Sequence, residues 1–576
     1  MTYLFCKSCV HRTASARAFL ILGLLLFAVF APLARGGQAP VNNDAARVTR
    51  LADEYVREYI ARNPEAATFE GLPNAPDDKL SDNSLESLKA WRAREDDWLA
   101  RLAAIDGASL WGRPEWLTYG FLREALEGSK GLRVARLELW PVNQMSGWQA
   151  SLTQLASIQP VGSTAARERT LARFRQVPRS LDTEVLNLKE GLRLGYSTPK
   201  PNVELTLAQL DALLQAPVRE SPFFSPAKRD GDAGFKAEWE RLLTAEITPA
   251  VQRYRDYLKD EYLPKARTTI ALSALPNGAE AYRALLRAFT TLDRTAEETS
   301  RLGEQAVARY EAEAADIGRK LFGAKDLKAV LKKLERDPRS RFKTREELLE
   351  FSKAAVDRAR RALPQWVEFM PKAEVVIEPI PAYLEKTASS AYQSGAVDGS
   401  RPGVYLINLY QPENQTRANA ELTAFHETYP GHHFQISVSA ELPRPHLITR
   451  LVASGGYIEG WARYAEAWPR KWVSTRRTSP ALIVAYGPPT AWSSTPGFTS
   501  LAGRKSRRSH LSGRRVASVR TKRNPWSIGS SPGPPSSRPM TRARSNSSPS
   551  GKRPRRRWAR NSISGPSTPR SSGTGP

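Results

Sequence analysis

Cysteine, histidine and methionine are scarce in this chain of 576 residues, which holds two, six and four of them respectively. Both cysteines, Cys6 and Cys9, precede an N-terminal apolar run, and none follows it. Removal of that segment would leave no cysteine, so we expect no internal disulfide in the exported protein. The apolar run is also shorter than the roughly 20 residues that a bilayer requires, so no stable membrane span is expected after cleavage.

Acidic residues are missing from one end of the chain. Residues 468–576 contain 23 lysines and arginines but no aspartate or glutamate, whereas residues 1–467 hold 63 basic and all 59 acidic residues. The overall net charge of +27 therefore belongs to the tail, because the rest of the chain carries only +4. One interpretation is a basic, Ser/Pro/Arg-rich disordered tail that binds nucleic acid or a membrane surface.

We favour a second interpretation, in which the tail over 468–576 is an out-of-frame translation of a GC-rich gene. In the shifted frame Ala467 to Ser474 can encode Leu-Ala-Glu-Glu-Met-Gly-Leu, which continues the helix predicted before it. Lys552 to Pro569 can then encode a helix, a break and a second helix. On this frameshift hypothesis the domain is C-terminally incomplete as printed and could be inactive. The DNA sequence across codon 467 tests it.

The N-terminus has the pattern of a secretory signal. Lys7, Arg12 and Arg17 precede an apolar run over 18–31, and small residues follow. A charged segment, an apolar segment of this length and a small-residue region predict a signal peptide over 1–37. We therefore expect a periplasmic or secreted protein without a nucleic-acid partner, whose main domain spans 38–467.

The main domain is predicted to be mainly α: a large helical domain with a small β-sheet next to the candidate site. Apolar residues recur at three- and four-residue steps from Asp44 to about Ile105, with a break at Asn63-Pro64. Capping boxes at 295–298 and 344–347 predict the starts of two further helices. Two β-branched runs, 374–381 and 403–409, predict the strands of the sheet.

Three of the six histidines lie within 426–433, in the sequence His-Glu-Thr-Tyr-Pro-Gly-His-His. A histidine followed by glutamate on a helix, with further histidines beyond, is a pattern typical of zinc sites. Pro430 stands where an unbroken helix would place the second ligand, so His432 or His433 must reach the metal from a distorted turn. The sequence does not decide between them.

Two glutamates complete the candidate site. Glu459, in a second predicted helix, is the third candidate metal ligand, and Glu427 is placed to act as the general base. The alternatives are structural: His433 could be a core histidine, and Glu459 could pair with Arg463 one helical turn later.

These motifs resemble the DUF885 family of bacterial proteins, which look like zinc metallopeptidases. The resemblance covers residues 44–466 and is carried by HETYPGHH, the preceding DGSRPGVYLINL and the following EGWARYAE. It implies a mainly helical fold and metal-dependent hydrolysis. It also implies one Zn²⁺ bound by His426, by His432 or His433, and by Glu459, with Glu427 as the base.

The sequence thus predicts an exported zinc metallohydrolase, most simply a peptidase, in which metal-activated water attacks a peptide or another small amide. Two other functions stay open: an exported helical binding protein without activity, and a nucleic-acid or membrane-surface binder that uses the basic tail. Nothing in the sequence identifies the specificity or the oligomeric state.

Overall fold

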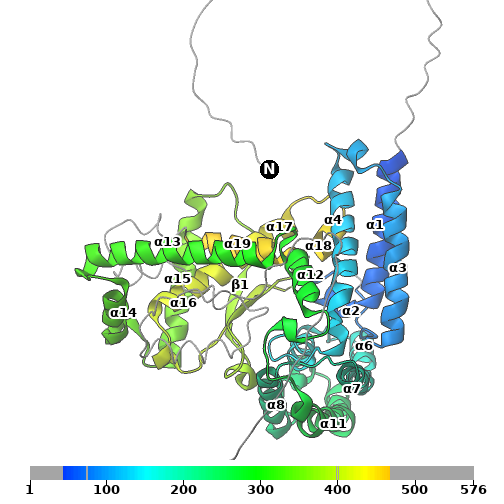
Figure 1. Ribbon diagram of the computed structural model, residues 1–576. Helices are drawn as coiled ribbons and strands as arrows, with labels where there is room; N and C mark the ends of the chain where they lie inside the picture. Colours follow the sequence, from blue (N-terminus) through cyan, green and yellow to red (C-terminus); the bar gives the residue numbers. More distant parts are fainter. Residues whose placement is uncertain (1–42, 73–74, 397–398, 400, 468–576) are drawn as a thin grey trace, which may run out of the picture. The chain divides into compact units, whose positions relative to one another are not determined.

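The structure is a computed structural model that describes residues 43–72, 75–396, 399 and 401–467 (Figure 1). The predicted signal peptide and the basic tail lie outside these residues. The described part consists mostly of helices, with one sheet of three short strands, which confirms the predicted mainly-α fold. None of its helices is both long and apolar enough to cross a membrane.

The N-terminal helices pack around an aromatic-rich core. They are α1 (Asn43–Arg62), α2 (Pro64–Phe69), α3 (Leu85–Ala103) and α4 (Pro114–Leu132). Helices α1, α3 and α4 stand side by side in Figure 1. Tyr55 and Trp98 are buried between them and meet edge to face, with ring centroids 5.3 Å apart. Pro64 ends α1 as predicted and also opens α2, because proline fits the first turn of a helix.

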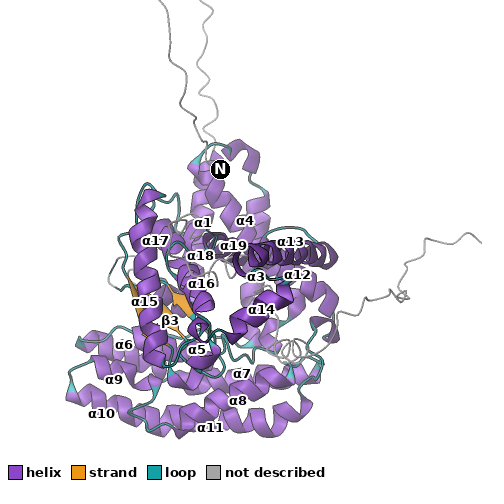
Figure 2. Cartoon of the chain, turned by 90° about the vertical axis from the view of Figure 1, so that its left-hand side faces the viewer, coloured by secondary structure: helices purple, strands orange, loops and turns teal. Residues whose placement is uncertain are grey.

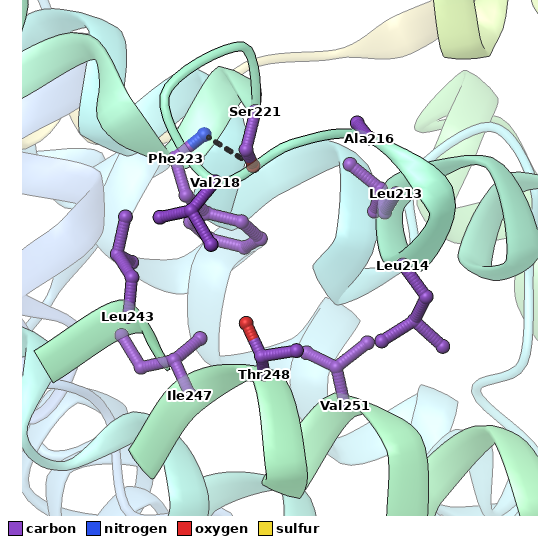
Figure 3. A pocket seen from close by; sticks show the side chains of 10 residues that line it. All are labelled: Leu213, Leu214, Ala216, Val218, Ser221, Phe223, Leu243, Ile247, Thr248 and Val251. Atoms are coloured by element: carbon purple, nitrogen blue, oxygen red, sulfur yellow. Dashed lines mark hydrogen bonds between the residues drawn. The ribbon is translucent and has the colours of Figure 1, made fainter. Parts of the chain in front are cut away.

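The middle of the chain forms a second helical core. Its helices are α5 (Trp148–Ile158), α6 (Thr164–Phe174), α7 (Val177–Arg193), α8 (Lys200–Gln215), α9 (Ser225–Arg229), α10 (Ala233–Leu242) and α11 (Thr248–Asp256). A cavity of about 80 Å³ lies in this core, between α8, α11 and the π-helix Leu243–Ile247 (Figure 3). Eight of its ten lining residues are apolar, and the other two, Ser221 and Thr248, carry no charge. The cavity therefore lacks the convergent polar groups of a ligand site, and we interpret it as a packing gap.

Four further helices lead to the sheet: α12 (Gly278–Thr290), α13 (Ala296–Phe322), α14 (Leu327–Arg336) and α15 (Arg345–Ala362). The capping box before α13 is confirmed, because Thr295 and Glu298 exchange two hydrogen bonds of 3.0 and 3.1 Å. The box before α15 forms only in part. Thr344 caps the helix, but the carboxylate of Glu347 accepts a hydrogen bond from the backbone N–H of Lys343 instead of that of Thr344.

The sheet contains β1 (Val375–Pro379), β2 (Ala391–Gln393) and β3 (Gly403–Ile407), in the order β1-β3-β2. Strand β1 runs parallel to the central strand β3, and β2 runs antiparallel to it. Figure 2 shows the sheet beside α15, and the buried Tyr405 and Ile407 of β3 share a core with α15 and α16 (Arg417–Glu427). Both predicted strands are present. Strand β2 was not predicted, because three residues without a β-branched side chain give no local signal.

The described chain ends in the helices that carry the candidate site. After α16 come α17 (His432–Glu441), α18 (Ile448–Leu451) and α19 (Gly455–Ala465). Ile448 of α18 is buried in the aromatic core of the N-terminal helices, so the last part of the described chain packs against its first part. Helix α19 contacts both α16 and α17, and it thereby brings Glu459 to the histidine motif.

Candidate metal centre

The histidine motif forms two helices joined by a tight turn. Helix α16 ends at Glu427 and α17 begins at His432, so the helix breaks where Pro430 and Gly431 predict a distortion. Gly431 lies against the end of α16, and its N–H donates to the carbonyl of Phe425 at 3.0 Å. A Cβ atom on Gly431 would lie 1.9 Å from the carbonyl oxygen of His426. Only glycine therefore allows this return of the chain.

Three side chains, one each from α16, α17 and α19, converge. His426, His432 and Glu459 each offer one ligand atom, and these atoms all lie within 4.8 Å of one another. The Nε2 atom of His426 is 3.4 Å from Glu459 Oε2, and the Nε2 atom of His432 is 3.8 Å from Glu459 Oε1. The imidazole rings meet edge to face, with centroids 4.6 Å apart.

His433 points elsewhere. Its ring is fully buried, with Nε2 3.0 Å from the hydroxyl of Tyr429 and Nδ1 3.0 Å from the hydroxyl of Tyr392. Burial is the main cause that lowers its pKa to about 4, so the ring is neutral. The structure thus brings His432, and not His433, to His426 and Glu459. His433 instead connects α17 to strand β2 through Tyr392.

A second carboxylate, that of Glu466, also contacts His426. Glu466 Oε1 is 2.8 Å from Nδ1 of His426 and also accepts a hydrogen bond from Arg463 at 2.9 Å. Arg463 therefore pairs with Glu466, and not with Glu459 as the structural alternative had it. Burial lowers the pKa of His426, but hydrogen bonds with Glu459 and Glu466 outweigh it and raise the pKa to about 9. The carboxylates thus stabilise positive charge at this position.

Sequence reasoning assigned no role to Glu466. The signal was present, because Glu466 follows Glu459 by seven residues and therefore shares its helix face two turns later. An imidazole that binds a metal commonly donates its other ring N–H to a carboxylate. Glu466 is in the position for that hydrogen bond.

Glu427 lies next to the cluster and is buried. Its carboxylate accepts a hydrogen bond from the backbone N–H of Tyr392 in strand β2. Burial raises the pKa of Glu427 to about 7, against the opposing effect of the charge on His426. Burial likewise lowers the pKa of His432 to about 4, and the charge on His426 adds to that effect.

The donor set fits a zinc ion. Four ligands at about 2.05 Å around a tetrahedral zinc stand about 3.3 Å apart. The distance of 3.4 Å from His426 Nε2 to Glu459 Oε2 matches that value, and the three ligand atoms together lie within 4.8 Å. Two imidazoles and one carboxylate are also the ligand types of a catalytic zinc site with one open position. His426, His432 and Glu459 would therefore hold the zinc ion, and Glu427 lies next to this cluster.

Comparisons with known proteins agree with the fold. The model of a family described as bacterial protein of unknown function (DUF885) matches residues 64–471. A structure described as a "putative lipoprotein" from Colwellia psychrerythraea superposes with a TM-score of 0.68 at 19% identity, over 77% of this chain and 80% of that one. A second, from Shewanella oneidensis and of unknown function, gives 0.54 at 18% identity, over 76% and 79%. No curated protein matches the chain.

Proposed function

The chain belongs to the DUF885 family, and from this premise we propose that it is an exported zinc-dependent hydrolase that cleaves peptides. One observation carries the proposal: His426, His432 and Glu459 come from separate helices and place their ligand atoms within 4.8 Å of one another. A buried carboxylate, Glu427, stands beside them. A purely structural ion pair needs only one imidazole beside a carboxylate. Here two imidazoles lie within 4 Å of the Glu459 carboxylate.

The residues of the site divide the chemistry among them. His426, His432 and Glu459 would hold Zn²⁺, which supplies a Lewis acid that polarises the scissile carbonyl and acidifies the attacking water. A carboxylate oxygen of Glu427 would accept the proton that water loses as it attacks the carbonyl carbon. Glu427 would then donate this proton to the amine nitrogen as the carbon–nitrogen bond breaks. Glu466 would orient His426 through the hydrogen bond to Nδ1.

We include in the proposal that the protein is exported and that residues 468–576 are an out-of-frame translation. The predicted signal peptide supports an extracytoplasmic location, and so does the description of two structural neighbours as lipoproteins. The frameshift hypothesis is supported by an exposed aromatic side chain on α19, since Tyr457 is 59% exposed. An in-frame continuation would supply helices to cover it.

Metal analysis tests the proposal. We would express a protein that begins near Arg35, both as printed and with the frame restored, and measure zinc by plasma mass spectrometry. The expected result is one zinc per chain, lost in His426→Ala and retained in Glu427→Gln without peptide hydrolysis. His446→Ala is the matched control, because His446 pairs with Asp53 at 2.9 Å and lies outside the cluster. Zinc absent from the unsubstituted protein, or unchanged in His426→Ala, would refute the proposal.

A further inference from the structure

A cavity of about 320 Å³ lies along strand β2, at the edge of the sheet. Tyr392, Gln393 and Ser394 line it on the side of the strand, and Phe69 and Glu70 line it from the end of α2. The remaining lining comes from α5 and the residues just before it. Its volume is at the lower end of the range for ligand-binding sites, and it suits one or two side chains of a peptide.

The free edge of β2 connects this cavity to the candidate metal centre. Strand β2 pairs with β3 on one side, and its other side carries the Tyr392 N–H that donates to Glu427. In an antiparallel strand the N–H and C=O of one residue point to the same side, so the Tyr392 carbonyl faces this free edge as well. A peptide whose backbone N–H donates to the Tyr392 carbonyl would therefore lie between the cavity and Glu427.

Glu70 is the one charged residue among the ten that line this cavity. Within the described residues its carboxylate has no hydrogen bond and no ion pair at contact distance. Burial raises the pKa of Glu70, whereas Arg450, Arg444 and Arg401 lower it from a distance. Those guanidinium groups donate to main-chain carbonyls, as Arg401 does to Ser394 at 2.6 Å, and they do not line the cavity. Glu70 is thus a carboxylate that lines the cavity and that no other described residue engages in a hydrogen bond or ion pair.

We propose that this cavity is the substrate cleft of the hydrolase and that Glu70 selects peptides with a positively charged group at this position. The inference rests on the proposed function and adds the substrate class. An ammonium or guanidinium group would donate hydrogen bonds to the Glu70 carboxylate while a backbone N–H of the peptide donates to the Tyr392 carbonyl. The cationic group can come from the peptide N-terminus or from a lysine or arginine side chain.

Peptide binding tests the proposal without turnover. The full chain, exported and processed by the host, would carry Glu427→Gln, and calorimetry would measure three alanine-based hexapeptides. One has a free N-terminus, one is acetylated with a single lysine, and one is acetylated and neutral. At least one cationic peptide should bind about tenfold more tightly than the neutral one, the size expected for a charge-assisted hydrogen bond. The cationic peptide that shows the preference identifies the source of the charge.

Glu70→Gln, added to the same background, should reduce this ratio to nearly one. Glu378→Gln is the matched control and should keep it, because Glu378 is exposed on β1 at the opposite edge of the sheet. A preference that survives Glu70→Gln, equal binding of all three peptides, or no binding at all would overturn the inference. Zinc content reports on the hydrolase separately: zinc bound as expected without charge preference refutes the cleft alone, whereas charge-dependent binding without zinc refutes the hydrolase alone.

Discussion

Glu466 offers the most direct probe of how the candidate metal centre is organised. Its Oε1 atom lies 2.8 Å from Nδ1 of His426, and its side chain is only 11% exposed. Glu466→Ala removes both the charge and the acceptor that fix the orientation of the imidazole. Loss of such a supporting carboxylate weakens metal binding by about 10- to 100-fold. We expect the upper value here, about 2.7 kcal/mol, because the hydrogen bond is short and nearly buried.

Glu466→Gln should weaken zinc binding less than Glu466→Ala does. Glutamine keeps an oxygen that can accept from Nδ1, and the charge that it loses is already paired with Arg463 at 2.9 Å. We therefore expect zinc affinity to fall by about tenfold, or about 1.4 kcal/mol. The assay is competition for zinc with a chromogenic chelator at fixed pH. Glu304→Gln on the exposed face of α13 serves as the control for loss of one negative charge.

The result that refutes this reasoning is equal zinc affinity in Glu466→Ala and in the control variant. Urea unfolding of the zinc-free proteins separates a local effect from loss of the fold. If Glu466→Ala lowered zinc affinity only because it unfolded the chain, the free energy of unfolding would fall in parallel. A nearly unchanged unfolding curve with weakened zinc binding supports the orienting role.

Three further predictions follow from the packing. Gly431→Ala should lower the free energy of unfolding by about 2–4 kcal/mol and abolish zinc binding, because the new Cβ would meet a backbone carbonyl at 1.9 Å; thermal melts and metal analysis check this, and a loss below about 0.5 kcal/mol contradicts it. Arg173→Met should lower the free energy of unfolding in urea by about 3–5 kcal/mol. The fully buried guanidinium donates to the main-chain carbonyl of Lys79 and to the side-chain oxygens of Thr68 and Gln159 at 2.8–3.0 Å; a change near zero would show that these bonds are dispensable. Burial raises the pKa of Glu184 to about 7 in the folded state, so the folded protein binds this proton more tightly than the unfolded chain. The free energy of unfolding therefore falls by up to about 3 kcal/mol as the pH rises from 4.5 through 7. Glu184→Gln should therefore stabilise the protein at pH 8 and change little at pH 4, and equal effects at both pH values would contradict the assignment.

Much of the fold could be predicted from local patterns. The helix over 296–322 begins at its capping box because Thr295 and Glu298 satisfy each other's backbone donors within one turn. The strands at 375–379 and 403–407 carry β-branched residues, so their conformation is evident without knowledge of their partners. Strand β2 could not be found in this way, because three residues become a strand only through hydrogen bonds to β3.

The candidate site likewise has features that local sequence predicts and features that only tertiary packing decides. Three features of the site are local properties that the sequence by itself predicted. They are the residue types, the order of His426 and Glu427, and the break at Pro430-Gly431. The choice of His432 over His433 was not, because neighbouring residues at a helix start differ in direction by about 100° and only the packing of α19 and β2 decides which side each faces. The meeting of Glu459 and Glu466 with His426, and of Glu70 with the free edge of β2, joins segments from 33 to more than 300 residues apart. Side chains so distant along the chain meet only through the tertiary packing of the helices and strands that carry them.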